Sequence, residues 1–111
     1  MELTYLYVPV SDLATACAFY GGELGLEEAW REGDGTVSFW GPDRTAQLML
    51  DVGGHPGGPM YEVADAAAWA AQHPGVPVRV PRYDIPGGSV CGHEDPGGNV
   101  FYVFDQRLRG S

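Results

Sequence analysis

Apolar residues recur along this chain at two different spacings. The segments 3–10 and 99–105 hold short, nearly continuous apolar runs bounded by turn residues, a pattern typical of buried strands. After Ser11, apolar residues recur every three or four positions, which predicts a helix with one buried face. The residues on that face are Leu13, Ala16, Cys17 and Tyr20. A second, alanine-rich helix is expected from Asp65 to about His73.

Three strands are expected after each predicted helix. In the first half they span 27–32, 36–41 and 46–52, and in the second half 78–85, 88–94 and 99–105. The segments between them are rich in Gly, Pro and Asp, as is typical of hairpin turns. Each half of the chain is therefore predicted to run β-α-β-β-β.

The two halves also share a loose sequence repeat. Val10–Ala16 resembles Val63–Trp69, which lies 53 residues later, and each copy carries an Asp placed to cap a helix. A chain of 111 residues is the length of one domain. We expect a single domain over 1–111, with a first module of about 1–52, a linker over 53–59 and a second module of about 60–107.

Two motifs, one at each end of the chain, carry a family resemblance. The first is an apolar strand and capped helix that run into Phe19-Tyr20 and Leu24-Gly25-Leu26, and the second is the turn Asp95–Gly98 with the apolar strand after it. Together they resemble the vicinal oxygen chelate superfamily, which holds glyoxalase I, extradiol dioxygenases and bleomycin-resistance proteins. The resemblance implies an α+β fold of two βαβββ modules, whose curved mixed sheets form a cleft, and a homodimer.

The resemblance also implies where a metal ion would be held. Metal-using relatives place a His on the first strand, an acid near the fourth, a His or similar residue on the fifth and a Glu on the last. Here the first and last positions hold Tyr5 and Tyr102, and the middle two fall near Met49 or Leu50 and near Pro59. Divalent ions prefer imidazole and carboxylate ligands. The sequence thus predicts no metal and no other cofactor, as in the metal-free bleomycin-resistance branch.

Other chemistry stays open at a few positions. If the middle ligand positions slip by two residues, Asp51 or Glu62 enters the set, still without a His. His93 and Glu94 are strand neighbours and point to opposite faces, so they do not share an ion without a bulge. Cys91 lies two residues before His93 and is a candidate thiol–imidazole pair, although this spacing is common by chance. No catalytic set of residues emerges.

Strand alternation, with the ligand positions of the resemblance taken as cleft-facing, sorts the side chains of the expected cleft. It predicts aromatic walls, a thioether and an acid, a surface that stacks planar rings and attracts cations. The sequence does not fix which sides Trp30, Phe39 and Trp40 present. The candidate ligand-binding residues are Tyr5, Tyr7, Trp30, Trp40, Met49, Asp51, Tyr102 and Phe104.

The charge of the chain limits its partners. It has 15 acidic residues against 6 arginines, and its net charge of −9 excludes a nucleic-acid backbone as the expected partner. No apolar run reaches the length of a membrane span, so no membrane partner is expected. The 2 cysteines make no disulfide framework, and we expect a cytoplasmic protein.

Three functions remain after these exclusions. The first is a metal-free protein that binds and sequesters a small aromatic or cationic molecule, as antibiotic-resistance proteins of this superfamily do. The second is an enzyme of the same fold, a lyase, isomerase or dioxygenase with a non-standard site. It would be indicated by an acid such as Asp51 or Glu62 close to a Tyr hydroxyl. The third is a module with a structural or regulatory role and no ligand.

Overall fold

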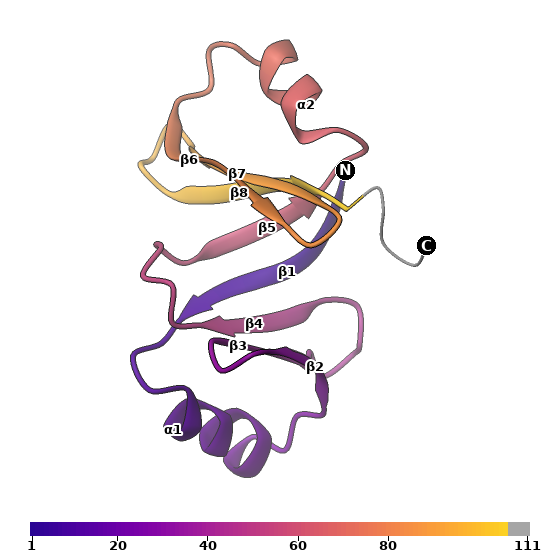
Figure 1. Ribbon diagram of the computed structural model, residues 1–111, viewed down its shortest axis with the longest axis vertical. Coiled ribbons are helices and arrows are strands. Elements are labelled where there is room, and N and C mark those ends of the chain that lie inside the picture. The colour runs from indigo at the N-terminus through magenta and orange to yellow at the C-terminus, as the bar shows by residue number, and fades with distance from the viewer. Residues whose placement is uncertain (107–111) are drawn as a thin grey trace. The chain divides into compact units, whose positions relative to one another are not determined.

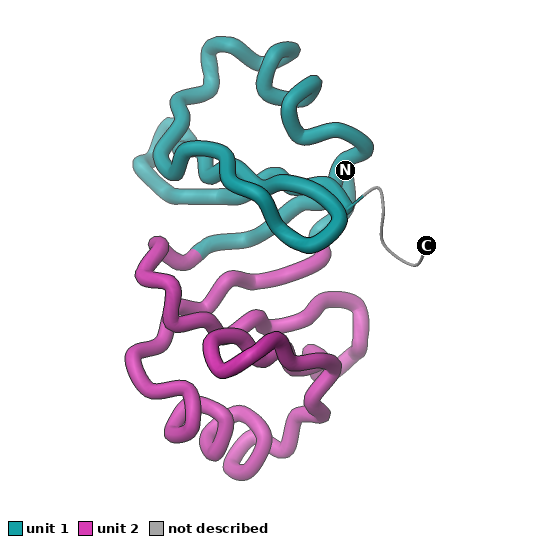
Figure 2. The backbone as a smooth tube through the Cα atoms, viewed as in Figure 1, with its two compact units in different colours: residues 1–3, 58–111 teal, residues 4–57 magenta. Residues whose placement is uncertain are grey.

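The computed structural model describes residues 1–106 and divides into two compact units. Unit 2 spans Thr4–Gly57, and unit 1 combines Met1–Leu3 with the chain from Gly58 onward (Figure 2). The predicted end of the second module, residue 107, lies outside the described residues. Within the described part, no helix is long and apolar enough to cross a membrane.

Unit 2 packs one helical segment against a four-stranded sheet (Figure 1). The elements are β1 (Glu2–Pro9), α1 (Leu13–Cys17), η1 (Ala18–Glu23), β2 (Glu28–Glu32), β3 (Thr36–Trp40) and β4 (Gln47–Asp51). The strands lie in the order β2-β3-β4-β1, with β1 parallel to β4 and the other pairs antiparallel. The first two strands of the chain therefore stand at the two ends of this strand order.

The first helix follows its predicted pattern and departs from it at the C-terminal end. Asp12 caps it by accepting a hydrogen bond from the Thr15 N–H at 3.1 Å. All four residues of the predicted buried face pack against the core cluster of Val37, Phe39 and Leu50. From Ala18 the helix widens into the π-helical turn η1, a form that is rare in proteins. The predicted helix is confirmed, and its π-helical end was not predicted.

Unit 1 also consists of a strand, a helix and three further strands. Its elements are β5 (Gly58–Glu62), α2 (Ala66–Gln72), β6 (Val78–Ile85), β7 (Gly88–Glu94) and β8 (Val100–Asp105). The strand order is β5-β8-β7-β6, with β5 parallel to β8. Asp65 caps α2, and Asp105 at the end of β8 accepts a hydrogen bond from the Ala66 N–H at 2.6 Å. β5 begins at Gly58, so the last two residues of the predicted linker lie in a strand.

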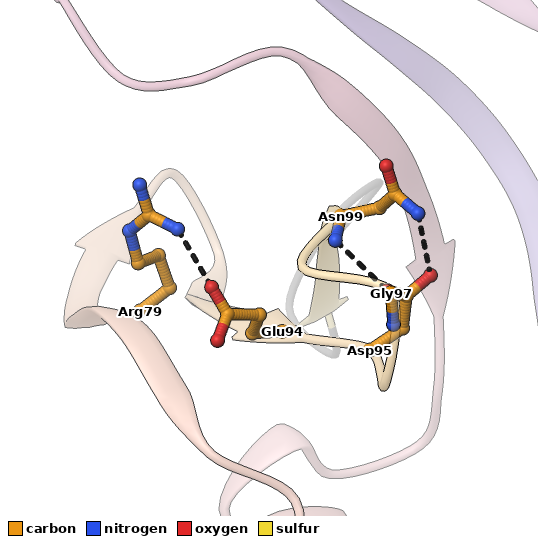
Figure 3. Close-up of polar contacts among 5 residues, drawn as sticks. All are labelled: Arg79, Glu94, Asp95, Gly97 and Asn99. Carbon is orange, nitrogen blue, oxygen red and sulfur yellow. Dashed lines mark hydrogen bonds and ion pairs between the residues drawn. The ribbon is translucent and has the colours of Figure 1, made fainter.

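The turn before β8 is held together by one aspartate (Figure 3). Asp95 Oδ1 accepts hydrogen bonds from the N–H groups of Gly97 at 2.9 Å and Asn99 at 2.8 Å. The amide of Asn99 also donates to Asp95 Oδ2 at 3.2 Å. Gly98 has a φ of 85°, which favours glycine. The closing motif of the sequence is therefore a structural element that sets the start of β8.

Candidate ligand-binding face

The candidate site lies on the face of the unit 2 sheet opposite α1. On β1, Tyr5 and Tyr7 alternate with residues that point to the helix side, where Val8 packs against the core. In the parallel pairing with β4, Tyr5 lies beside Gln47 and Tyr7 beside Met49. The two strands thus place two phenol rings, an amide and a thioether next to one another.

The next strand completes this face. Val37 and Phe39 of β3 are in the core, so the alternate residues Thr36, Ser38 and Trp40 point to the opposite side. Ser38 lies beside Met49 and Trp40 beside Gln47. The structure thus places the Trp40 and Phe39 side chains, which the sequence could not assign.

Trp30 on β2 shows that the sheet is strongly curled. Its ring meets the ring of Tyr5 edge to face, with the centroids 6.1 Å apart. These residues come from the two outer strands, which would be about 14 Å apart across three strand spacings in a flat sheet. The two rings therefore approach each other above the middle strands. We call this surface the aromatic face, formed by Tyr5, Tyr7, Trp30, Trp40, Gln47 and Met49.

Asp51 organises one end of the aromatic face. The Tyr7 hydroxyl donates to Asp51 Oδ2 at 2.5 Å, and the Thr36 hydroxyl donates to Oδ1 at 2.6 Å. The Gly53 N–H donates to Oδ2 at 3.0 Å. A Cβ at residue 53 would lie 2.5 Å from that same oxygen, so a larger residue there would push the carboxylate out of this position. Asp51 therefore fixes the orientation of the Tyr7 phenol.

Two further side chains border this arrangement. The ring of His55 lies 6.4 Å from the ring of Tyr7, at an angle of 50°. At the opposite end, the guanidinium of Arg44 lies 4.7 Å from the centre of the Trp40 ring and pairs with Glu27 at 2.8 Å. One side of the Trp40 ring is thereby covered by a cation.

Six of the eight sequence-predicted residues thus come together on one surface of unit 2, and the other two belong to unit 1. Tyr102 and Phe104 belong to β8 in unit 1, and each is 1% exposed. Burial, together with the neighbouring Tyr83, raises the pKa of the Tyr102 phenol to about 12, so it stays neutral at physiological pH. A role for these two in ligand contact stays a prediction.

The polar partners of the face were largely missed from the sequence. Thr36, Ser38 and His55 carry no motif, and the first two became assignable only once Trp40 had been placed. Once Trp40 is placed on this face, strand alternation along β3 assigns Ser38 and Thr36 to the same side. The hydrogen bonds of Thr36 and Ser38 join residues that are 15 and 9 positions apart in the sequence.

The histidines do not assemble a metal site. Among residues 1–106, no group of three or more His, Cys, Asp or Glu side chains lies close enough to hold an ion. His93 is 1% exposed and lies between the rings of Trp69 and Phe101, and neither of its nitrogens has a hydrogen-bond partner there. Tyr5 and Tyr102, at the positions where the family resemblance implies a His and a Glu, carry phenol oxygens rather than the imidazole and carboxylate donors that divalent ions prefer.

Comparison with known proteins identifies the fold. No protein-family model matches the sequence, and no curated protein matches it. A solved structure named as a glyoxalase/bleomycin resistance protein/dioxygenase superfamily member from Vibrio splendidus 12B01 matches 91% of this chain and 95% of its own, at 15% identity and a TM-score of 0.62. The fold is that of this superfamily.

Other structures of similar shape carry different names. One named methylmalonyl-CoA epimerase is 16% identical over 95% of this chain and 94% of its own, with a TM-score of 0.59. Another, named NAD-dependent benzaldehyde dehydrogenase from Legionella pneumophila, is 14% identical over 92% of this chain and 97% of its own, with a TM-score of 0.75. The glyoxalase/bleomycin resistance/dioxygenase fold hosts many activities, so function has to be argued from the site.

Proposed function

We propose that this protein binds a small planar aromatic molecule on the aromatic face of unit 2, without a metal ion. The observation that supports this most is the convergence of two tyrosines, two tryptophans and a methionine on one curled sheet face. Aromatic pairs contribute about 0.5–1.5 kcal/mol each beyond simple burial. The fold is also that of a superfamily whose name includes bleomycin resistance proteins.

Binding alone is enough for the function that we propose. A protein that sequesters a toxic compound needs affinity in excess of the compound's target and no reacting group. Within unit 2 the aromatic face offers rings and a soft thioether rather than a constellation of nucleophiles or metal ligands. It therefore favours sequestration of the antibiotic-resistance type. A cytoplasmic location and a homodimer are further parts of this proposal, and the family resemblance supports the homodimer.

Calorimetric titration with planar aromatic compounds tests this proposal. We expect dissociation constants below a millimolar for the wild type and at least tenfold weaker binding for Trp30→Ala, because one stacking wall is lost. Phe19→Ala is the matched control, since Phe19 is a 49% exposed aromatic residue on η1 and away from the aromatic face. Equal binding by both variants would place the ligand elsewhere.

A second candidate function is supported by the pair formed by Tyr7 and Asp51. A carboxylate 2.5 Å from a phenol oxygen is a geometry that general acid–base catalysis can use. We therefore propose an enzyme of the same fold as the alternative, with these two residues moving a proton to or from the bound molecule. Mass spectrometry of each bound compound after long incubation in deuterated water separates the two, because sequestration returns it unchanged, whereas proton transfer by Tyr7 and Asp51 introduces deuterium at carbon.

A further inference from the structure

Gln47 lies at the centre of the aromatic face. Its neighbours on the adjoining strands are Tyr5 on β1 and Trp40 on β3. The hydroxyl of Ser38 donates a hydrogen bond to Gln47 Oε1 at 2.7 Å, and Ser38 itself is fully buried. The Ser38 hydroxyl therefore fixes the Gln47 amide between the aromatic side chains of the two adjoining strands.

The bond from Ser38 decides which end of the amide is available. A primary amide has one acceptor oxygen and one donor nitrogen, and the serine hydroxyl uses the oxygen. Within the described part of the chain, Gln47 Nε2 has no hydrogen-bond acceptor. The aromatic face thus presents, among its rings, an N–H donor that a ligand can use.

Asp51 is mostly occupied by donors of its own unit. Its carboxylate oxygens together offer about four acceptor positions. Three are used by Tyr7, Thr36 and the Gly53 N–H, which fix the carboxylate and the Tyr7 phenol in place. One position is left at that end of the face, and the three donors are neutral groups. That Asp51 supplies a negative charge to the ligand stays a prediction.

From the hydrogen bonding of Gln47 we infer that the ligand is a planar aromatic molecule with a carbonyl oxygen or ring nitrogen that accepts a hydrogen bond from Gln47 Nε2. Gln47 is then the residue that determines specificity. A site built around a hydrogen-bond donor rejects an analogue that lacks the acceptor. The net charge of −9 disfavours an anionic acceptor. This inference rests on the function proposed above.

Three probes of similar size distinguish the hydrogen bond from Gln47, ring stacking and charge attraction, with the affinities measured by calorimetry. They are fluorenone, which has a ring carbonyl, fluorene, which has none, and the cationic aminoacridine. For the wild type we expect fluorenone to bind about three- to tenfold more tightly than fluorene, the range of one hydrogen bond. Aminoacridine reports separately on charge attraction by Asp51, and its affinity does not bear on Gln47. This comparison needs no variant and so does not depend on whether a variant folds.

The variant Gln47→Glu keeps an oxygen for Ser38 and replaces the donor nitrogen with a second acceptor. We expect fluorenone binding to fall to the level of fluorene, with fluorene unchanged. Gln72→Glu makes the same charge change on the exposed end of α2 and should alter none of the three affinities.

Each outcome decides the inference. Equal wild-type affinity for fluorene and fluorenone, or an equal effect of Gln47→Glu on both, would overturn the role of Gln47 while leaving aromatic binding intact. Binding of none of the three probes by the folded protein would overturn both the inference and the proposed function.

Discussion

At the scale of single residues, hydrogen bonds to Asp51 hold the aromatic face in shape. Thr36→Val keeps the volume of the side chain and removes one donor to this part-buried carboxylate. We expect a loss of about 1–3 kcal/mol in the free energy of unfolding, measured by urea denaturation. Thr45→Val removes a similar hydroxyl–carboxylate bond, from Thr45 to Asp43, on the exposed surface and should cost clearly less. Equal losses for both variants would mean that the Asp51 network does not stabilise unit 2.

The sequence could reach only some of these residues. Strand alternation predicts which face carries Tyr5, Tyr7, Met49 and Asp51, once one residue on each strand has been placed correctly. The hydrogen bonds of Thr36 and Ser38 depend on the pairing of β3 with β4, which no local pattern specifies. The ring contact between Tyr5 and Trp30 depends on the curl of the sheet, which is a property of all four strands together.

At the scale of elements, α2 covers a buried histidine of β7. Burial lowers the pKa of His93 from its ordinary value of 6.5; an interaction with the Pro77 backbone raises it in part, and the nearby His73 lowers it. Well above pH 6.5 the residue is neutral in both the folded and the unfolded chain, so it adds no pH dependence to stability there. As the pH falls from 6.5 through the lower folded pKa, the unfolded chain binds the proton first and stability declines.

The measurement is the free energy of unfolding between pH 8 and pH 5 for the wild type and His93→Phe. We expect the wild type to lose stability in this range more steeply than the variant, which has no proton to bind at this position. A His93→Phe profile parallel to that of the wild type would contradict the account.

The elements themselves were largely predictable, for reasons visible at particular residues. The predicted boundaries of β6 and β7 agree with the structure, since Pro, Gly and Asp mark the ends of these strands. β5 was partly hidden, because its first two residues, Gly58 and Pro59, have a turn-like composition. The π-helical turn was also hidden, since the apolar spacing up to Tyr20 fits an α-helix equally well.

At the scale of the whole molecule, the homodimer is a proposal that the family resemblance supports. We expect light scattering at micromolar concentration to give twice the chain mass of 11.9 kDa. Because the chain is strongly acidic, self-repulsion weakens association at low ionic strength, and added salt should favour the dimer. A mass of one chain at every salt concentration would exclude the dimer and leave the binding proposal standing.

The most direct test of the central claim is a nuclear magnetic resonance titration of the backbone amides with fluorenone. The account predicts that the largest shifts fall on the strands that carry the aromatic face, at Tyr5 and Tyr7 of β1, Ser38 of β3, and Gln47 and Met49 of β4. Saturable shifts confined to β6 and β7 of unit 1, or no shifts at millimolar fluorenone, would contradict it.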